Sequence, residues 1–499
     1  MSIQPSIVDF LSDLRTRHIQ LWVEDHQLRY SAPKQALTPD LRAEMVRRKA
    51  EIIEFLNTAQ TTTVTTPRLQ PVAHGALVPL SFAQQRLWLL DQLTPGSTAY
   101  LMPALVHLRG ALNISVFERS LNAIVERHEV LRTTFGIVQG EPRQQIGPHR
   151  PLVVPVIDLQ PLSEAERAVA VERQAIMEST QPFDLQQGPL IRARLLRVAA
   201  DEHLLLLTLH HIITDGWSMG VLLRELAALY LAGGDAAALS PLPVQYADYT
   251  LWQRAWLEDA VRERELTFWR EQLSGAPETL ALPTDHPRPP VQSFRGAVYR
   301  FQLPAALTAD LHALSRRADA TLFMTLLTAW STLLARFSGQ WDLTVGTPIA
   351  NRTQAALEPL IGFFVNTLVL RTDLAGNPSF LDALGRVRTT TLAAYAHQDL
   401  PFEHVVEALQ PQRSLSSSPL FQVLFALQNA PLPALRLGDV TLTVQDTPQT
   451  TAKFDLSLVL TETEHGLDAM LEYATDLFEA ATIVRLAQHF CTLLGAIVA

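Results

Sequence analysis

Two adjacent histidines and an aspartate interrupt an otherwise apolar stretch near the middle of the chain, LLLLTLHHIITDGWSMGVLLREL (204–226). An imidazole ionises near neutral pH, so His210 and His211 are candidates for accepting a proton from a substrate. A metal site would need at least one more close ligand, and consecutive residues rarely face the same ion. A buried structural pair is the remaining alternative, so the elements around the histidines have to decide between structure and chemistry.

The histidines lie between a predicted strand and a predicted helix. Leu204–Leu209 is a nearly continuous apolar run of strand length, which is typical of a strand buried on both faces. Apolar residues then return at helical spacing, at Trp217, Val221, Leu222 and Leu226. Asp215 and Gly216 are expected to form the turn, with Ser218 near the helix start. Such a connection holds functional groups at the edge of a sheet on a rigid support.

Composition narrows the class of protein. The chain has 499 residues, 47% of them hydrophobic and 18% charged, with a net charge of −10, which is typical of a globular protein of two or three units. No Lys/Arg-rich block stands out, so we expect neither nucleic acid nor an anionic membrane surface as a partner. The single cysteine excludes an internal disulfide. No secretory signal and no run of 18 apolar residues is present, which makes a cytoplasmic protein the default.

Composition also divides the chain. Residues 61–79 carry one charge, three prolines and a threonine cluster, which predicts a linker between a small head (1–60) and a large body. Each half of the body, 80–281 and 282–499, contains a strand followed by helical segments, and the proline-rich stretch LPTDHPRPPVQS (282–293) connects them. These patterns predict a boundary between two halves of the body. No adenylation or carrier signature is visible, so we expect the chain to be part of a longer subunit.

The head contains a helix, a hairpin and one or two further helices by pattern. Helical spacing runs over 7–14, two alternating stretches flank an Asp25-His26 turn, and Thr38-Pro39 begins a helix that extends to about Asn57. This order resembles the TubC-type N-terminal docking domains of nonribosomal peptide synthetase subunits. The resemblance implies that a C-terminal docking segment of an upstream subunit adds to the hairpin edge. A helical cap packed on the body is the alternative.

The body carries six motifs that resemble those of nonribosomal peptide synthetase condensation domains, within the chloramphenicol acetyltransferase-like superfamily. In chain order they are LSFAQQRLWLLDQLTPGSTAY (80–100), RHEVLRTTF (127–135), HHIITDGWS (210–218), YADYTLW (246–252), IGFFVNTLVLR (361–371) and HQDLPFE (397–403). The resemblance implies an α/β fold in which two pseudo-related lobes form a V around a central channel. The opening motif and HHIITDGWSMGVLL resemble the subtype that joins an L-configured donor to an L-configured acceptor.

The resemblance also implies roles for particular residues. His211 would act in catalysis, with His210 beside it and the backbone amide of Gly216 as an oxyanion donor. Asp215 would support the site through an ion pair, and Arg295 is the best match for its partner. Trp217 and Ser218 are candidates for the channel lining. Asn366 is a third candidate, because an asparagine in an apolar run needs a polar partner.

The reaction implied is amide formation between two thioesters. An upstream carrier protein would present an acyl or peptidyl group, and a downstream carrier, loaded by an adenylation domain, would present the attacking amine. Both groups arrive on phosphopantetheine arms, so no metal or other cofactor bound by this chain is expected. A stand-alone HHxxxDG acyltransferase that uses coenzyme A thioesters and an inactive carrier-binding scaffold are the alternatives. The intact His211 argues against the scaffold, and the docking head argues against the stand-alone enzyme.

Overall fold

The computed structural model describes residues 20–24, 27–31, 39–49, 51–52, 67–411, 414–428, 435–445 and 451–499. The chain divides into two compact units, Met1–Pro67 and Arg68–Ala499. We refer to them as the N-terminal unit and the main unit.

The N-terminal unit contains the predicted hairpin. β1 (Gln20–Glu24) and β2 (Gln27–Ser31) pair antiparallel, with Leu21 opposite Tyr30. α2 (Pro39–Arg47) begins at a proline, whose fixed φ suits the first helical position. The hairpin and this helix start are confirmed, while the helix predicted over 7–14 lies outside the described residues.

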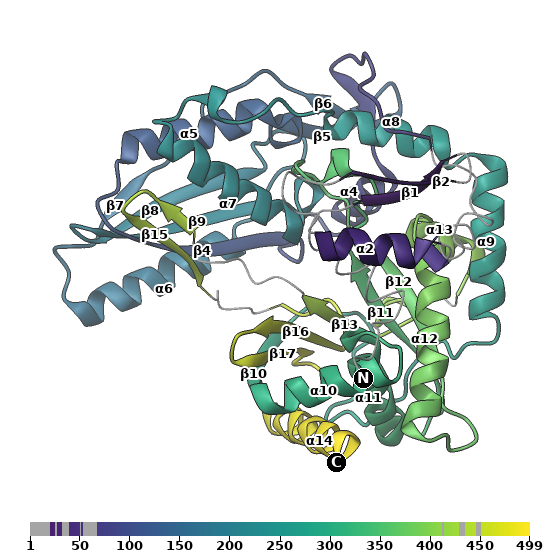
Figure 1. Ribbon diagram of the computed structural model, residues 1–499. Helices are drawn as coiled ribbons and strands as arrows, with labels where there is room; N and C mark the ends of the chain where they lie inside the picture. Colours follow the sequence, from purple (N-terminus) through teal and green to yellow (C-terminus); the bar gives the residue numbers. More distant parts are fainter. Residues whose placement is uncertain are drawn as a thin grey trace. The chain divides into compact units, whose positions relative to one another are not determined.

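The first half of the main unit is built around a six-stranded sheet (Figure 1). In spatial order its strands are β14 (Leu435–Leu437), β15 (Val440–Gln445), β4 (Leu101–Arg109), β9 (Glu202–His210), β8 (Ile191–Ala199) and β7 (Val156–Asp158). β9 lies between β4 and β8 and is buried from His203 to His210. Both faces of such a strand are covered, which explains its continuous apolar sequence.

Helices cover the two faces of this sheet. α5 (Ile114–Arg127) and α7 (Gly216–Leu231) pack together over one face, where Leu205, Leu207 and Leu209 of β9 point. α6 (Glu164–Thr180) covers the other face, over Leu204 and Leu206. The remaining elements of this half are α4 (Phe82–Leu93), α8 (Tyr246–Trp256), α9 (Asp259–Leu273), the small sheet β3 (Leu77–Pro79), β6 (Glu141–Ile146) and β5 (Thr133–Val138), and the 3-10 turns η1 (Glu129–Arg132), η2 (His211–Ile213) and η3 (Ala236–Ala238).

The second half is built around another six-stranded sheet (Figure 1). In spatial order its strands are β10 (Gly296–Pro304), β17 (Gly466–Ala474), β16 (Leu456–Thr463), β13 (Val423–Gln428), β11 (Asp342–Ile349) and β12 (Asn366–Asp373). Its helical elements are α10 (Ala305–Arg317), α11 (Leu322–Ser338), η4 (Ala355–Leu357), α12 (Phe380–Ala396), α13 (Phe402–Leu409) and α14 (Ala480–Val498). We call the two halves the N-terminal lobe and the C-terminal lobe; the α/β class with two helix-covered sheets is the predicted one.

α14 is the described helix that is long and apolar enough, by length and composition alone, to cross a membrane. α10 and α11 pass the same test only when they are counted as one span broken by 102°. α14 buries Ile483, Ala487, Phe490 and Leu494 in the core of the C-terminal lobe. A stripe at this spacing is that of a helix packed on one side against a globular core.

Two segments of the C-terminal lobe pack with the N-terminal lobe. The connection between β11 and β12 places Leu357, Leu360, Ile361, Phe363 and Phe364 in the core beneath α5 and α7. β15 extends the N-terminal sheet by pairing antiparallel with β4. The predicted boundary between residues 281 and 282 therefore does not separate the two lobes completely, because segments that follow it pack in the N-terminal lobe.

The predicted linker, 61–79, is too long at its C-terminal end. The main unit already begins at Arg68. The backbone amides of Leu69 and Val72 donate to the side chains of Gln354 and Asp248, each over 2.8 Å, and β3 pairs with β6. Leu69 and Val78 are buried, so the low charge of this stretch reflects contact with the main unit; residues 61–66 lie outside the described ones.

Candidate active site

The HHIITDG segment forms the connection from β9 to α7. His210 ends the strand, η2 follows, and Asp215 is the N-cap of α7, its carboxylate accepting from the Ser218 amide over 2.8 Å. The His211 amide donates to the Tyr100 carbonyl over 2.8 Å, which ties the loop to the start of β4. The predicted strand-to-helix connection is confirmed. Gly216 begins the helix without a positive φ, so the turn does not need the conformational freedom expected of it.

The His211 ring is held in one tautomer. Its Nδ1 lies 2.7 Å from the Thr214 carbonyl oxygen, and because a carbonyl only accepts, Nδ1 carries the hydrogen. The ring meets Phe363 of the C-terminal lobe edge-on, with centroids 4.7 Å apart. Nε2 therefore presents its lone pair, and it has no hydrogen-bond partner among the described residues. A fixed imidazole with a free acceptor nitrogen is the form that can take a hydrogen from a substrate.

His210 has a different environment. Its side chain is 4% exposed, its Nδ1 accepts from the Ile212 amide over 3.1 Å, and its ring lies edge-on to Phe183. These contacts stabilise the turn that presents His211. Of the two histidines predicted as catalytic, the structure places His210 in the supporting role.

Both imidazoles are neutral near neutral pH. Burial lowers the pKa of His211 to about 3, and the charge of Lys453 adds to this effect, while the bond to Thr214 opposes it. Burial also lowers the pKa of His210 to about 3, with smaller contributions from His211 and Lys453. No carboxylate among the described residues pairs with either ring, so burial would leave a proton there uncompensated.

Acid is therefore expected to destabilise the main unit through these two residues. Their pKa values are about 3 in the folded chain and 6.5 when unperturbed, so unfolding takes up protons between about pH 6.5 and about pH 3. The free energy of unfolding falls by about 1.4 kcal/mol per pH unit for each histidine as the pH is lowered through this window. Above about pH 6.5 neither contributes a slope.

Denaturant unfolding at a series of pH values measures this dependence. The variant His211→Gln removes one of the two imidazoles, so its stability should fall less steeply with acid than that of the wild type. Equal slopes for the two proteins would show that His211 is not buried in its neutral form.

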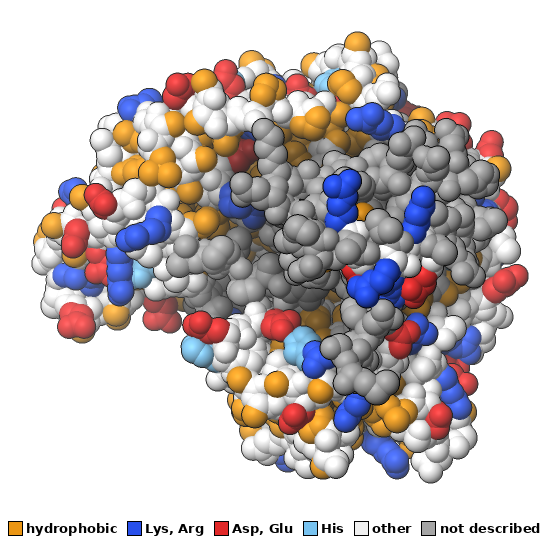
Figure 2. Space-filling model, in the orientation of Figure 1, with side chains coloured by type: hydrophobic (Ala, Val, Ile, Leu, Met, Phe, Trp, Pro, Cys, Tyr) orange, Lys and Arg blue, Asp and Glu red, His pale blue; other side chains and the backbone are white. Residues whose placement is uncertain are grey.

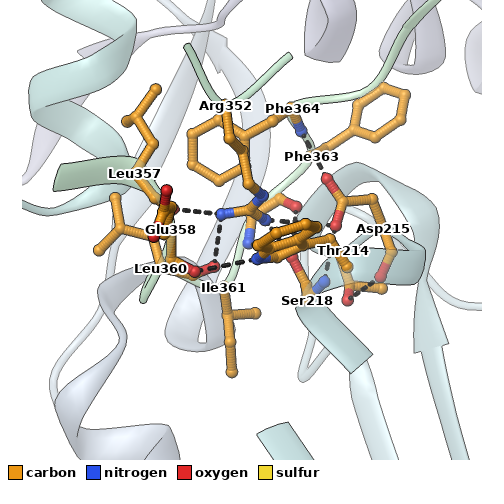
Figure 3. Close-up of polar contacts among 12 residues, drawn as sticks. Thr214, Asp215, Ser218, Arg352, Leu357, Glu358, Leu360, Ile361, Phe363 and Phe364 are labelled. Carbon is orange, nitrogen blue, oxygen red and sulfur yellow. Dashed lines mark hydrogen bonds and ion pairs between the residues drawn. The ribbon is translucent and has the colours of Figure 1, made fainter. Parts of the chain in front are cut away.

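Asp215 is the centre of a polar network between the lobes (Figure 3). Its side chain is fully buried, accepts from the Ser218 and Phe364 amides over 2.8 and 3.0 Å, and pairs with Arg352 at 3.3 Å. The Arg352 guanidinium also donates to the Leu357 and Leu360 carbonyls. Since Arg352 is carried by the connection from β11 to β12, this pair fixes the histidine loop to the C-terminal lobe.

Ser218 belongs to the same network. Its hydroxyl accepts from Arg352 over 2.8 Å and from the Gly362 amide over 3.0 Å, and donates to the Gly362 carbonyl over 2.9 Å. The side chain is buried, so the prediction that Ser218 lines a channel does not fit its position. At its position in α7, the Ser218 hydroxyl faces Arg352 and Gly362 of the C-terminal lobe instead.

The predicted pairing of Asp215 with Arg295 is wrong. Arg295 pairs with Asp476, and its side chain is 74% exposed. Its backbone forms an isolated bridge with Thr451 at the edge of the C-terminal sheet. A buried carboxylate needs a partner that is also buried, and Arg352, at 2% exposure, meets that condition.

The other predicted site residues differ in exposure. Gly216 is exposed at the first turn of α7, where backbone amides have no intrahelical acceptor. Trp217 is 45% exposed and donates from Nε1 to the Glu358 carbonyl over 3.0 Å. Asn366 is buried, its amide donating to the Gln398 and Leu400 carbonyls and its oxygen accepting from Phe402. Every polar group of Asn366 thus serves the fold, so the channel role predicted for it is wrong.

Four residues at the site were not identified from the sequence. Tyr100 and Phe363 hold His211 by a backbone bond and a ring contact, Arg352 pairs with Asp215, and Lys453 contacts the Tyr100 ring. All four come from distant segments of the chain. A charge that packing buries needs compensation, but the sequence alone does not show that Arg352 and Lys453 reach the site.

Comparison with known families and proteins identifies the chain. The condensation domain family matches residues 76–499, and the TubC N-terminal docking domain family matches residues 7–57. One of the linear gramicidin synthase subunits of Brevibacillus parabrevis is 51% identical over 441 residues, which are 87% of this chain and 8% of that protein. Phosphinothricin tripeptide synthetase PhsC of Streptomyces viridochromogenes is 44% identical over 431 residues, 85% of this chain and 39% of that protein. The chain thus spans a minor part of these relatives.

Solved structures share the fold. The X-domain from teicoplanin biosynthesis superposes with a TM-score of 0.79 at 31% identity, over 87% of this chain and 97% of its own. The first condensation domain of the calcium-dependent antibiotic synthetase, at 22% identity, gives a TM-score of 0.72 over 85% of this chain and 97% of its own, and supports the fold alone. With His211 held at a strand-to-helix connection between two lobes, the chain belongs to the condensation domain family of nonribosomal peptide synthetases, and a docking domain of the TubC type precedes its condensation domain.

Proposed function

We propose that the main unit forms an amide bond between the acyl or peptidyl thioester of an upstream carrier protein and the amine of a downstream aminoacyl thioester. The observation that carries the proposal is the His211 ring, neutral and fixed by Thr214, with Nε2 free to accept. An L-configured donor and an L-configured acceptor are the substrates that the motifs favour.

The reaction would proceed by attack of the neutral amine on the thioester carbonyl carbon. The new C–N bond forms, the carbon–sulfur bond breaks, and the proton lost by nitrogen goes to the departing thiolate. His211 is a weak base, because its pKa is about 3. It therefore orients the amine by accepting a hydrogen bond from it, and the proton moves on to the departing thiolate instead of remaining on the ring. Gly216 is exposed, and its amide, in the first turn of α7, is the donor that we assign to the carbonyl oxygen as charge develops there.

Positioning supplies much of the expected rate. Thioesters are already activated, and holding two tethered groups together contributes several kcal/mol. The network around Asp215 and Arg352 keeps the histidine loop fixed against both lobes, which supports this role. No cofactor bound by the chain itself is needed, because both substrates arrive on phosphopantetheine arms.

The partners follow from the same proposal. They are the upstream donor carrier, the docking segment of the upstream subunit, the downstream acceptor carrier and its adenylation domain. On the face drawn in Figure 2, the described basic and acidic side chains are interspersed rather than gathered by sign, which fits protein partners better than nucleic acid or an anionic membrane. A cytoplasmic location is part of the same proposal, because it suits a biosynthetic role of this kind.

A protein-binding scaffold is the second candidate function. The X-domain of teicoplanin biosynthesis, which has been crystallised in complex with OxyB, shares this fold at 30% identity. A condensation fold can thus serve to bind another protein. A stand-alone acyltransferase that uses coenzyme A is a third candidate, which the docking domain disfavours.

A direct assay distinguishes these functions. Donor and acceptor carrier proteins are loaded with synthetic aminoacyl groups, mixed with the full chain, and examined by mass spectrometry for the amide on the acceptor arm. Amide formation that depends on the chain supports condensation. Binding of loaded carriers without any amide, across a panel of side chains, would favour the scaffold, and product formed equally well from coenzyme A thioesters would favour the stand-alone enzyme.

Removing residues 1–60 is expected to separate docking from chemistry. The truncated chain should condense groups from directly supplied carriers at the wild-type rate, because the main unit begins at Arg68 and forms a compact unit of its own. Transfer from an upstream subunit at low concentration should be lost, because the truncated chain lacks the hairpin edge that we propose binds the short tail of that subunit. Such binding is of about micromolar affinity. Aggregation of the truncated chain, or slow condensation with supplied carriers, would show that the N-terminal unit is part of the catalytic fold.

A further inference from the structure

Lysine is almost absent from this chain. Of its 40 Lys and Arg residues, three are lysines, at positions 34, 49 and 453, and the other 37 are arginines. Lys453 is the single lysine of the main unit. A lysine differs from an arginine in having a compact charge that it can lose when buried. The surroundings of Lys453 therefore decide whether its side chain is charged.

The backbone at Lys453 is held at the junction of the lobes. The Ala452 amide donates to the Phe294 carbonyl over 2.9 Å, and the Gln292 side chain donates to the Lys453 carbonyl over the same distance. These contacts join the segment before β16 to the connection between the lobes. The Lys453 side chain thus starts from a fixed point of the C-terminal lobe.

Its ammonium group ends against the N-terminal lobe. Nζ lies 4.9 Å from the centroid of the Tyr100 ring, a cation–π distance. Tyr100 is the residue whose carbonyl holds the His211 amide. Tyr100 therefore contacts both the Lys453 ammonium of the C-terminal lobe and the His211 loop of the N-terminal lobe.

The charges around Lys453 leave it without a direct counterion. Among the described residues no ion pair involves Lys453. Glu472 of β17, whose carboxylate accepts from the Lys453 backbone amide, favours the charge of the ammonium, and Arg86 of α4 opposes it. Arg86 is itself paired with Glu403 of α13 at 3.3 Å. Tyr100 and the two histidines are further described ionisable groups near the ammonium.

We propose that Lys453 is a positioning residue of condensation, whose ammonium beside the histidine loop keeps both His211 and the attacking amine unprotonated. A positive charge disfavours a second positive charge nearby, whether imidazolium or substrate ammonium. The amine must be neutral to attack, so this charge selects the reactive form. The inference rests on the proposed condensation function and adds to it a residue that acts together with burial to keep the reacting groups neutral.

The titration behaviour of Lys453 agrees with this role. Burial lowers its pKa to about 8, with Glu472 opposing and Arg86 adding to the shift. The group is thus mainly charged at neutral pH. It is also one of the causes that lower the pKa of His211.

The test uses three variants of the full chain. Lys453→Met removes the charge and keeps the length, Lys453→Arg keeps the charge, and Lys453→Gln is a polar second replacement in case the methionine variant does not fold. The pKa of His211 is measured by NMR with isotope-labelled histidine, its signal assigned through His211→Ala. We expect an upward shift in the methionine and glutamine variants and none in the arginine variant.

Condensation as a function of pH is the second readout. Removal of the charge raises the pKa of the substrate amine, which must be neutral to attack, so the acid limb of the profile should move to higher pH. At about pH 6.5 the methionine variant should be roughly tenfold slower than wild type, the effect of one pKa unit, and should approach the wild-type rate at higher pH. The arginine variant should follow the wild type.

A third readout comes from the scarcity of lysine. Labelling of lysine side chains gives three signals in the full chain, and the one that Lys453→Arg removes should titrate near pH 8. An unchanged His211 titration in both charge-removing variants overturns the proposal, as does a loss of rate that is the same at every pH and persists in the arginine variant. Absence of condensation in the wild type instead overturns the proposed function, and the His211 titration still decides the electrostatic role of Lys453.

Discussion

Replacing His211 with alanine is expected to lower the rate of condensation by about a hundredfold to ten-thousandfold, the range associated with a lost acid–base group. The reason is geometric: Nδ1 is committed to Thr214, and Nε2 is the nitrogen that can accept from the amine. Alanine leaves no acceptor at this position. The loss should appear with carriers loaded to saturation, because the variant still binds both arms.

The fold should survive this change. The loop is held by backbone contacts of Tyr100 and by the carboxylate of Asp215, and the His211 side chain is only partly buried. Far-UV circular dichroism and the melting temperature at neutral pH provide the control. A folded His211→Ala protein that condenses at the wild-type rate would remove this residue from the mechanism and leave positioning alone.

A matched variant in the same motif separates chemistry from support. His210→Asn removes the adjacent imidazole, which accepts from the Ile212 amide inside the turn. We expect its main effect on stability, with a smaller loss of rate than His211→Ala, because the presented nitrogen of His211 remains. The contrast tests the distinction that the two environments imply.

The catalytic loop was predictable because its signals are local. An apolar run of strand length, two histidines and a helical pattern lie within 204–226, so periodicity alone places the pair on the connection from β9 to α7. The same applies to the hairpin of β1 and β2, whose turn and alternation are adjacent in the chain. In both cases the residues that carry the pattern are neighbours in the chain, so the pattern alone predicts the local structure.

The partner of Asp215 was not predictable in that way. Arg295 and Arg352 both lie in short irregular segments of the C-terminal lobe, and charge alone does not distinguish them. What distinguishes them is that the connection from β11 to β12 crosses into the core of the N-terminal lobe, which brings Arg352 to the start of α7. Such a crossing depends on packing between segments more than a hundred residues apart.

Asn366 shows the limit of a chemical argument from sequence. An asparagine in an apolar run needs hydrogen-bond partners, and Asn366 has them. The partners are backbone groups of Gln398, Leu400 and Phe402, which lie in the HQDLPFE motif. Two motifs that were considered separately thus bind each other, and the pair stabilises the C-terminal lobe rather than lining a channel.

Removing the carboxylate of Asp215 is expected to cost about 3–5 kcal/mol of stability, as for other buried ion pairs that lose one member. Asp215→Ala leaves the Arg352 guanidinium, 2% exposed, without its counterion. It also leaves the Ser218 and Phe364 amides without their acceptor, and unpaired buried donors add to the loss. Denaturant or thermal unfolding of the full chain, followed through the transition of the main unit, measures the change.

Arg295→Ala is the matched control. It removes a guanidinium of the same lobe that pairs with an aspartate at the surface, where an exposed ion pair contributes little. We expect a melting temperature close to that of the wild type. If Arg295→Ala were as destabilising as Asp215→Ala, the assignment of Arg352 as the partner would be wrong.

A double-mutant cycle measures the coupling between Asp215 and Arg352. Arg352→Met alone should be strongly destabilising, because it strands the Asp215 carboxylate in the same buried site. Asp215→Ala combined with Arg352→Met removes both charges, so its loss should be clearly smaller than the sum of the two single losses. Activity gives the last distinction, since a structural pair lowers the rate only as far as the histidine loop loses its position. An Asp215→Ala protein with wild-type stability and no condensation would place the carboxylate in the chemistry instead.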